Sequence, residues 1–181
     1  MSIYSDLCTA MTGAQDKNED FRRKAQSMAG SFADALHKHI GAPKSWVLEV
    51  DGHKTDNPYV SAVPVDENGV EYRADTPSLA AMSFTQDNFY RFKLVLVLER
   101  SPESFPKNLH MIPCGVRPEK DGSCMLFVEL PGIPQHRIFH CTAFDALKKS
   151  AAQQIDYTTP VKYCVELVKT WFSFDPFGAK A

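Results

Sequence analysis

The sequence predicts a single α+β domain spanning residues 1–181, with a largely antiparallel sheet of about six or seven strands flanked by helices at both ends of the chain. Two observations lead to this prediction. Near both termini, apolar residues recur at spacings of three and four, which is typical of amphipathic helices, whereas the middle of the chain alternates with a period of two, which is typical of strands. The length of 181 residues suits one domain.

The clearest helix is predicted for residues 16–40. Its apolar positions are Phe21, Ala25, Met28, Phe32, Leu36 and Ile40. This spacing puts them on one face of a helix, as expected for a helix that packs on a core. Asp16 followed by Glu19 resembles a capped start, and Gly41 supplies the stop. A separate short helix is predicted for residues 5–11.

Strands are predicted for residues 45–50, 59–65, 70–73, 90–98, 109–116, 123–130 and 135–141. Asn68-Gly69 accepts the positive φ of a tight turn, so residues 59–65 and 70–73 are expected to pair as a hairpin. The run at 90–98 is apolar on both sides, which predicts a central strand.

Two more helices are predicted after the strands. Thr142 would cap the first, which extends to Ile155, and Thr159-Pro160 would begin the second, which extends to Phe172. These two helices and the N-terminal helix are expected to pack on the sheet. We expect the N-terminal helix to cover one face and the C-terminal pair to cover the other.

Both faces of the predicted sheet are apolar. One face collects Leu94, Leu96, Leu98, Ile112, Cys114, Val116, Cys124, Leu126, Val128 and Leu130. The other carries Val95, Val97, Leu109, Met111, Met125 and Phe127. An alternative to full coverage by helices is therefore that part of this second face, or the aromatic C-terminal segment, contacts another chain.

Charge and composition narrow the class of protein. A net charge of −2 disfavours nucleic-acid binding, and the run Arg22-Arg23-Lys24 is explained by favourable pairs with the acidic residues before it. No signal peptide is evident, and the run at 94–98 is too short to span a membrane. The five cysteines follow no disulfide pattern, which favours reduced thiols and a cytoplasmic location.

Potential metal ligands are numerous but poorly spaced. The densest set is His110, Cys114, Cys124, His136, His140 and Cys141. Because it lacks the close cysteine pairs of zinc sites, we expect no metal and no cofactor. If Cys141 points into the core, His136 and His140 both point away from it. Whether this set converges in space depends on the fold.

The sequence carries no nucleophile elbow, phosphate-binding glycine loop or metalloprotease helix, so no common enzyme class is indicated, although an enzyme remains an open alternative.

The candidate binding residues are the aromatic side chains Trp171, Phe172, Phe174, Phe177 and, in a loop, Tyr59. We therefore expect a non-catalytic protein-binding module, such as an adaptor, chaperone-like factor or inhibitor, that contacts a partner protein or a second copy. The alternative is a small enzyme or small-molecule-binding domain with a pocket between sheet and helix.

Overall fold

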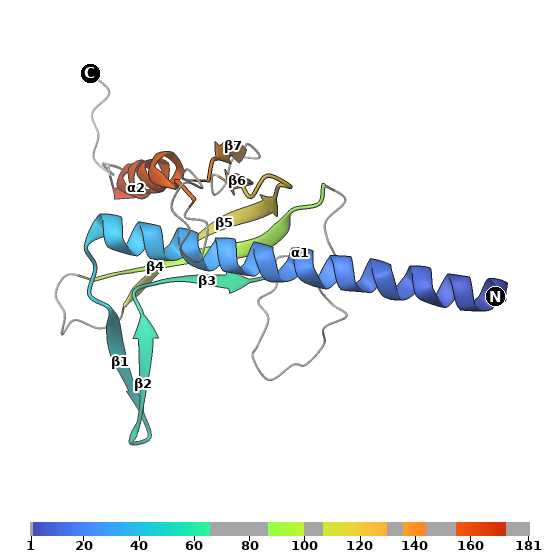
Figure 1. Ribbon diagram of the computed structural model, residues 1–181. Helices are drawn as coiled ribbons and strands as arrows, with labels where there is room; N and C mark the ends of the chain where they lie inside the picture. Colours follow the sequence, from blue (N-terminus) through green and yellow to red (C-terminus); the bar gives the residue numbers. More distant parts are fainter. Residues whose placement is uncertain (1, 66–86, 100–106, 130–135, 144–154, 173–181) are drawn as a thin grey trace, which may run out of the picture.

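The computed structural model describes residues 2–65, 87–99, 107–129, 136–143 and 155–172. Within these ranges the elements are α1 (Ile3–Ile40), β1 (Ser45–Val50), β2 (His53–Pro58), β3 (Val60–Pro64), β4 (Tyr90–Leu98), β5 (Asn108–Pro118), β6 (Cys124–Glu129), β7 (His136–Cys141) and α2 (Thr158–Phe172). The predicted α+β class, with a long N-terminal helix and antiparallel strands, is confirmed (Figure 1). Neither helix in these ranges combines the length and the apolar character needed to cross a membrane.

Helix α1 is a single helix of 38 residues, so the prediction of a short helix followed by a new start at Asp16 was wrong. The N-cap is Ser2, whose hydroxyl accepts a hydrogen bond of 3.3 Å from the backbone N–H of Ser5. Gly13 does not interrupt the helix, since glycine inside a helix costs only about 1 kcal/mol relative to alanine. The predicted end is confirmed: Gly41 has φ 64° and its N–H donates to the carbonyl of His37.

Strands β3 to β7 form a five-stranded antiparallel sheet in chain order. The register pairs Leu94 with Ile112 and Leu126 with Phe139. Strand β4 lies inside this sheet as predicted, but β5 is its middle strand. The predicted partner of β3, residues 70–73, lies outside the described residues, and β3 pairs here with β4.

The core lies between one face of this sheet and both helices. It joins five residues of α1 and several of α2 to the sheet face that carries Leu94, Ile112 and Leu126. The expectation that the C-terminal helices would cover the face opposite the N-terminal helix was therefore wrong for the helix at residues 158–172. Helix α1 also contacts the residue just before α2, because the Phe32 ring packs on Tyr157, whose hydroxyl donates to the Met28 carbonyl at 3.1 Å.

The second sheet face is buried only in part. Phe127 is enclosed by the Phe89 ring, by the guanidinium of Arg91 at 4.0 Å from the ring centroid, and by Gly115, where a Cβ atom would overlap the ring. In contrast, Leu109 and Met111 on the same face are exposed. The close approach of Phe127 to the backbone is a reason for glycine at position 115.

Strands β1 and β2 form a separate two-stranded sheet that stands away from the main sheet (Figure 1). Its turn is Asp51-Gly52, with φ of 51° and 78°, a dipeptide that accepts the positive φ of a tight hairpin turn. The second strand, β2, was not predicted. Its sequence HKTDNP has no apolar alternation, and its side chains are largely exposed.

Only one of the two predicted C-terminal helices is present in the described part of the chain. Helix α2 agrees with the second prediction, and the Asp156 carboxylate caps it by accepting from the Thr158 N–H at 2.9 Å. The other prediction falls on residues 142–155, of which 144–154 lie outside the described residues. Its last residue, Ile155, is not helical, because it forms an antiparallel bridge with Ala143.

Candidate functional site

Two of the four predicted C-terminal aromatic residues lie at the end of α2. Trp171 is half-buried and stacks on the His110 ring at a centroid distance of 5.6 Å. Phe172 meets the same ring edge-on at 5.2 Å but is 60% exposed. Among the described residues, the buried Nε2 atom of His110 has no hydrogen-bond partner. Phe174 and Phe177 lie outside the described residues.

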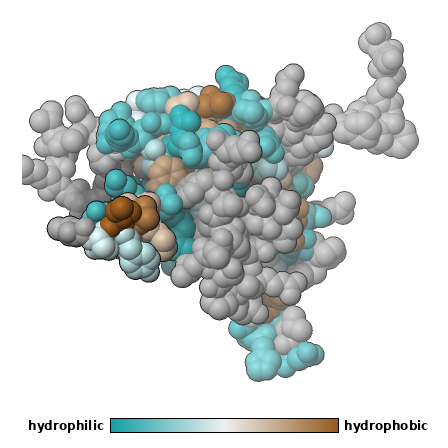
Figure 2. Space-filling model, turned by 90° about the vertical axis from the view of Figure 1, so that its right-hand side faces the viewer, coloured by the Kyte–Doolittle hydropathy of each residue, from teal (hydrophilic) through white to brown (hydrophobic). Residues whose placement is uncertain are grey.

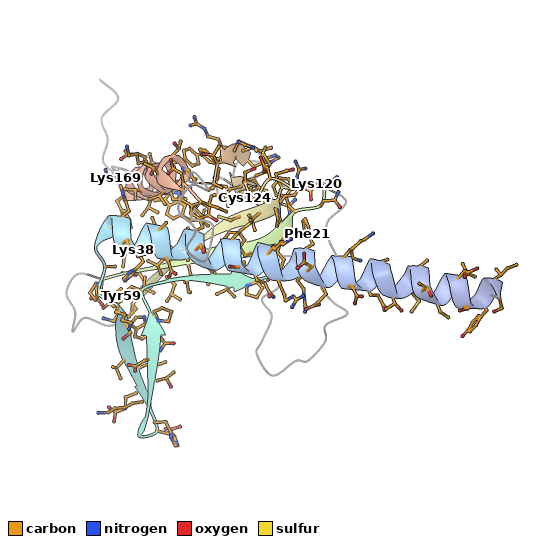
Figure 3. The ribbon with its side chains drawn as sticks, in the orientation of Figure 1. Phe21, Lys38, Tyr59, Lys120, Cys124 and Lys169 are labelled. Atoms are coloured by element: carbon orange, nitrogen blue, oxygen red, sulfur yellow. The ribbon has the colours of Figure 1, made fainter. Side chains whose placement is uncertain are left out.

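Tyr59, the other predicted binding residue, is only 4% exposed. Its hydroxyl donates to Glu99 at 2.7 Å, and the nearly buried ammonium of Lys107 pairs with the same carboxylate. The hydrogen bond from Lys107, followed by that from Tyr59, holds the pKa of Glu99 below its usual value. The bond to Glu99 likewise raises the pKa of Tyr59. Tyr59 therefore joins β3 to the end of β4 (Figure 3) and offers little surface to a partner.

The cysteines and histidines that were considered as potential metal ligands are separated by the sheet. Cys114, Cys124 and Cys141 are buried on the core face, whereas His136 and His140 are exposed on the other. His110 is on the core face beside Trp171. Within the described ranges no group of three or more His, Cys, Asp or Glu side chains is placed to hold a metal ion.

The buried thiols are poor nucleophiles. Burial raises the pKa of Cys114, and it raises the pKa of Cys164 to about 12. Cys124 and Cys141 are directly opposite on β6 and β7, where a thiol hydrogen bond from Cys141 lowers the pKa of Cys124 and raises that of Cys141. Because the Cys124 side chain is inaccessible, its lowered pKa does not make it available to a substrate.

A surface that the sequence did not single out lies on the first half of α1. Every residue from 2 to 20 is exposed except Gly13, and the helix runs here beyond the sheet without another described element beside it (Figure 1). We call residues 3–20 the arm. Its large apolar side chains are Ile3, Tyr4, Leu7 and Met11, with exposed fractions of 81%, 76%, 63% and 62%. We call these four the arm stripe.

The arm stripe continues the face of α1 that packs on the core. At about 3.6 residues per turn, positions 18 residues apart are five turns apart and point the same way. Leu7 is thus in line with Ala25, and Met11 with Ala29, both of which are buried against the sheet. Phe21, half-buried and labelled in Figure 3, lies between the two halves of the helix.

The charges of the arm belong to Asp6, Asp16, Lys17, Glu19 and Asp20. Asp6, Asp16 and Asp20 lie away from this stripe, whereas Lys17 and Glu19 flank it on either side. Five turns further along the helix, the residues on the same side as these three aspartates are all exposed, so this side of α1 faces solvent along its length. They are Lys24, Asp34 and Lys38. The predicted ion pairs on this side are present in part: Asp20 pairs with Lys24 at 2.8 Å, while Glu19 pairs with Arg22 and not with Arg23. In the end-on view of Figure 2, the free end of α1 shows hydrophobic atoms toward the viewer.

A groove of about 390 Å³ lies between α1 and the strands β3 and β4. Its walls are mostly small or apolar, including Ala29, Gly30 and Ala62. Its polar side chains include Asp34 and Ser61. The volume is within the range of small-molecule sites, which is roughly 300–1,000 Å³.

Comparison with known proteins assigns no family to the chain. No family model matches it, and no curated protein and no solved structure is significantly similar to it.

Proposed function

We propose that the chain is a non-catalytic protein-binding module, acting as an adaptor, chaperone-like factor or inhibitor through exposed apolar and aromatic side chains. The observation that supports this most strongly is the arm. A helix segment of this length is only marginally stable in water by itself, because helical stability in proteins comes mainly from packing an apolar face. The arm has such a face, and its four large apolar side chains are exposed to solvent.

The end of α2 supplies a second apolar contact in this proposal. Phe172 is exposed beside the stacked pair of Trp171 and His110. Exposed aromatic side chains next to a rigid, half-buried neighbour are typical of interface anchors. Phe174 and Phe177 would extend this contact. We expect the double change of Phe174 and Phe177 to Ser to weaken association while the melting temperature stays near that of the wild type.

The experiment that tests the proposal places a photo-crosslinking amino acid at Leu7 in the cells that naturally produce the chain. Its matched control carries the same amino acid at Thr9, which is also exposed but lies on the opposite side of the helix. Protein adducts from position 7 and none from position 9 are expected. If neither position yields a protein adduct, the arm is not a protein-binding surface and the proposal fails.

A second candidate, a small-molecule-binding domain, is favoured by the groove between α1 and β3. Native mass spectrometry of the purified chain would detect a bound compound of defined mass. A stoichiometric compound that raises the melting temperature would support this candidate. The groove and the arm occupy different parts of α1, so the two experiments report on separate surfaces.

A further inference from the structure

The apolar face of the arm is free of charge along four turns of helix. Besides the arm stripe, it carries Cys8, Ala14, Gln15 and Asn18. A charge-free apolar face disfavours nucleic acid and acidic or basic peptides as partners, because it offers them no opposite charge. It does suit a second copy of itself, because no like charges meet when the two faces are brought together.

We propose that two copies of the chain associate through their arms, which pair as antiparallel helices about a twofold axis that crosses between them at the height of position 9. This inference rests on the proposed function and names the partner as a second copy. The antiparallel direction follows from charge. It brings the N-terminal end of each helix, where the helix dipole is positive, toward residues 16–20 of the other arm, which carry three carboxylates and one ammonium.

The register follows from the sizes of the side chains. With the axis near position 9, Tyr4 of one arm lies opposite Ala14 of the other, and Leu7 lies opposite Met11. The largest side chain of the face thus meets the smallest, and the two medium ones meet each other, as interdigitating helices require. The spacing of Tyr4, Leu7, Met11 and Ala14 alternates between three and four, which is the pattern of a two-helix seam.

The elements that the structure describes leave room for this pair. The arm stripe and the sheet lie on the same side of α1, so the second arm would continue the layer that the sheet forms beneath the inner half of the helix (Figure 1). In this register Ile3 of the partner reaches position 15, short of Ala25, the first residue of α1 that belongs to the core. A stable pair needs about 800 Å² from each partner. Four large exposed side chains, with the smaller ones along the same turns, supply an area of that order.

Disulfide trapping tests both the pairing and its direction. In a background with Cys8→Ser, which removes the only exposed cysteine, Tyr4→Cys and Ala14→Cys are made separately and mixed. Oxidation should give mainly the mixed disulfide. In the antiparallel pair, position 4 of one arm lies about 15 Å along the helix axis from position 4 of the other arm, and the same distance separates the two positions 14. Identical variants are therefore too far apart to form a disulfide with each other. A parallel pair would instead give the two symmetric disulfides and would overturn the proposed direction.

Solution mass tests the existence of the pair. Sedimentation should show twice the chain mass of 20.3 kDa at high concentration, and Leu7→Asp should return the single-chain mass. Thr9→Asp, on the opposite side of the arm, should remain paired, and both variants should melt as one folded domain. A single-chain mass for the wild type, or a pair that persists in Leu7→Asp, would overturn the inference. A foreign protein captured at position 7 together with a single-chain mass would leave protein binding in place while excluding self-pairing.

Discussion

The two halves of α1 have the same apolar pattern and opposite surroundings. In the inner half, residues 21–40, the apolar face includes Ala25, Phe32 and Leu36, all buried against the sheet. In the outer half, the arm, the same face carries Leu7 and Met11, and both are exposed. The comparison teaches that an amphipathic pattern specifies a face that must be covered but does not specify what covers it. For the arm, the covering surface has to come from outside the packing that the structure describes.

The largest expected difference between the two halves of α1 is in how much a leucine-to-alanine substitution lowers the free energy of unfolding. Leu36→Ala should lower the free energy of unfolding by about 2–5 kcal/mol, because it removes a buried side chain and leaves a cavity. Leu7→Ala should change it by no more than about 0.5 kcal/mol in the dilute single chain, because Leu7 makes no core contact. Urea denaturation at low protein concentration measures both. Equal losses would mean that the arm is part of the cooperative fold and would remove the distinction between the halves.

Acid should separate the folded body from the arm. The pKa of Glu99 is lower in the folded chain than in the unfolded chain, so its contribution to stability is present at neutral pH and is lost as the pH falls through the folded value. Glu99→Gln should therefore melt at a lower temperature than the wild type at pH 7, and the two melting curves should converge in acid. Asp6→Asn, a change of the same kind in the arm, should follow the wild type throughout. Parallel curves for Glu99→Gln and wild type would contradict the role of the Glu99–Lys107 pair.

The smallest expected effect compares two glycines of α1, each with open space where a Cβ atom would lie. Gly30→Ala in the inner half should raise the free energy of unfolding by up to about 1 kcal/mol, since alanine favours the helix. Gly13→Ala in the arm should raise the helix content of the dilute protein and leave the midpoint of global unfolding unchanged. Circular dichroism during urea denaturation gives both quantities. A raised midpoint for Gly13→Ala would show that the arm unfolds together with the domain.

The sheet and its core were largely predictable because their strands repeat a simple pattern. Alternation from Leu94 to Leu98 and from Cys124 to Val128 assigned the correct residues to the core face. Strand β2 was missed because its pairing with β1 depends on backbone hydrogen bonds and the Asp51-Gly52 turn, not on apolar side chains. The position of both helices on one face of the sheet depends on the path of the chain between the elements. Local periodicity carries no information about that path.

The arm shows where a usable signal was underestimated. A short helix was predicted for residues 5–11 and a separate one from Asp16, whereas the two segments form one continuous helix. Carrying the periodicity of residues 21–40 back toward the N-terminus would have joined the two segments. It would not have revealed the exposure of the arm, since that depends on where the sheet ends. The burial of Tyr59 was also beyond local sequence patterns, because its bond to Glu99 forms between residues 40 positions apart.

Hydrogen exchange of the backbone amides in residues 3–18 at two protein concentrations tests the central claim most directly. An unsupported helix of this length opens readily, so its amides should exchange fast in dilute protein and slowly in concentrated protein, where a second arm covers it. The amides of residues 25–36 should exchange slowly at both concentrations. Fast exchange of the arm at every concentration would contradict pairing with a second copy. Slow exchange in the dilute protein would contradict the claim that no other described part of the same chain supports the arm.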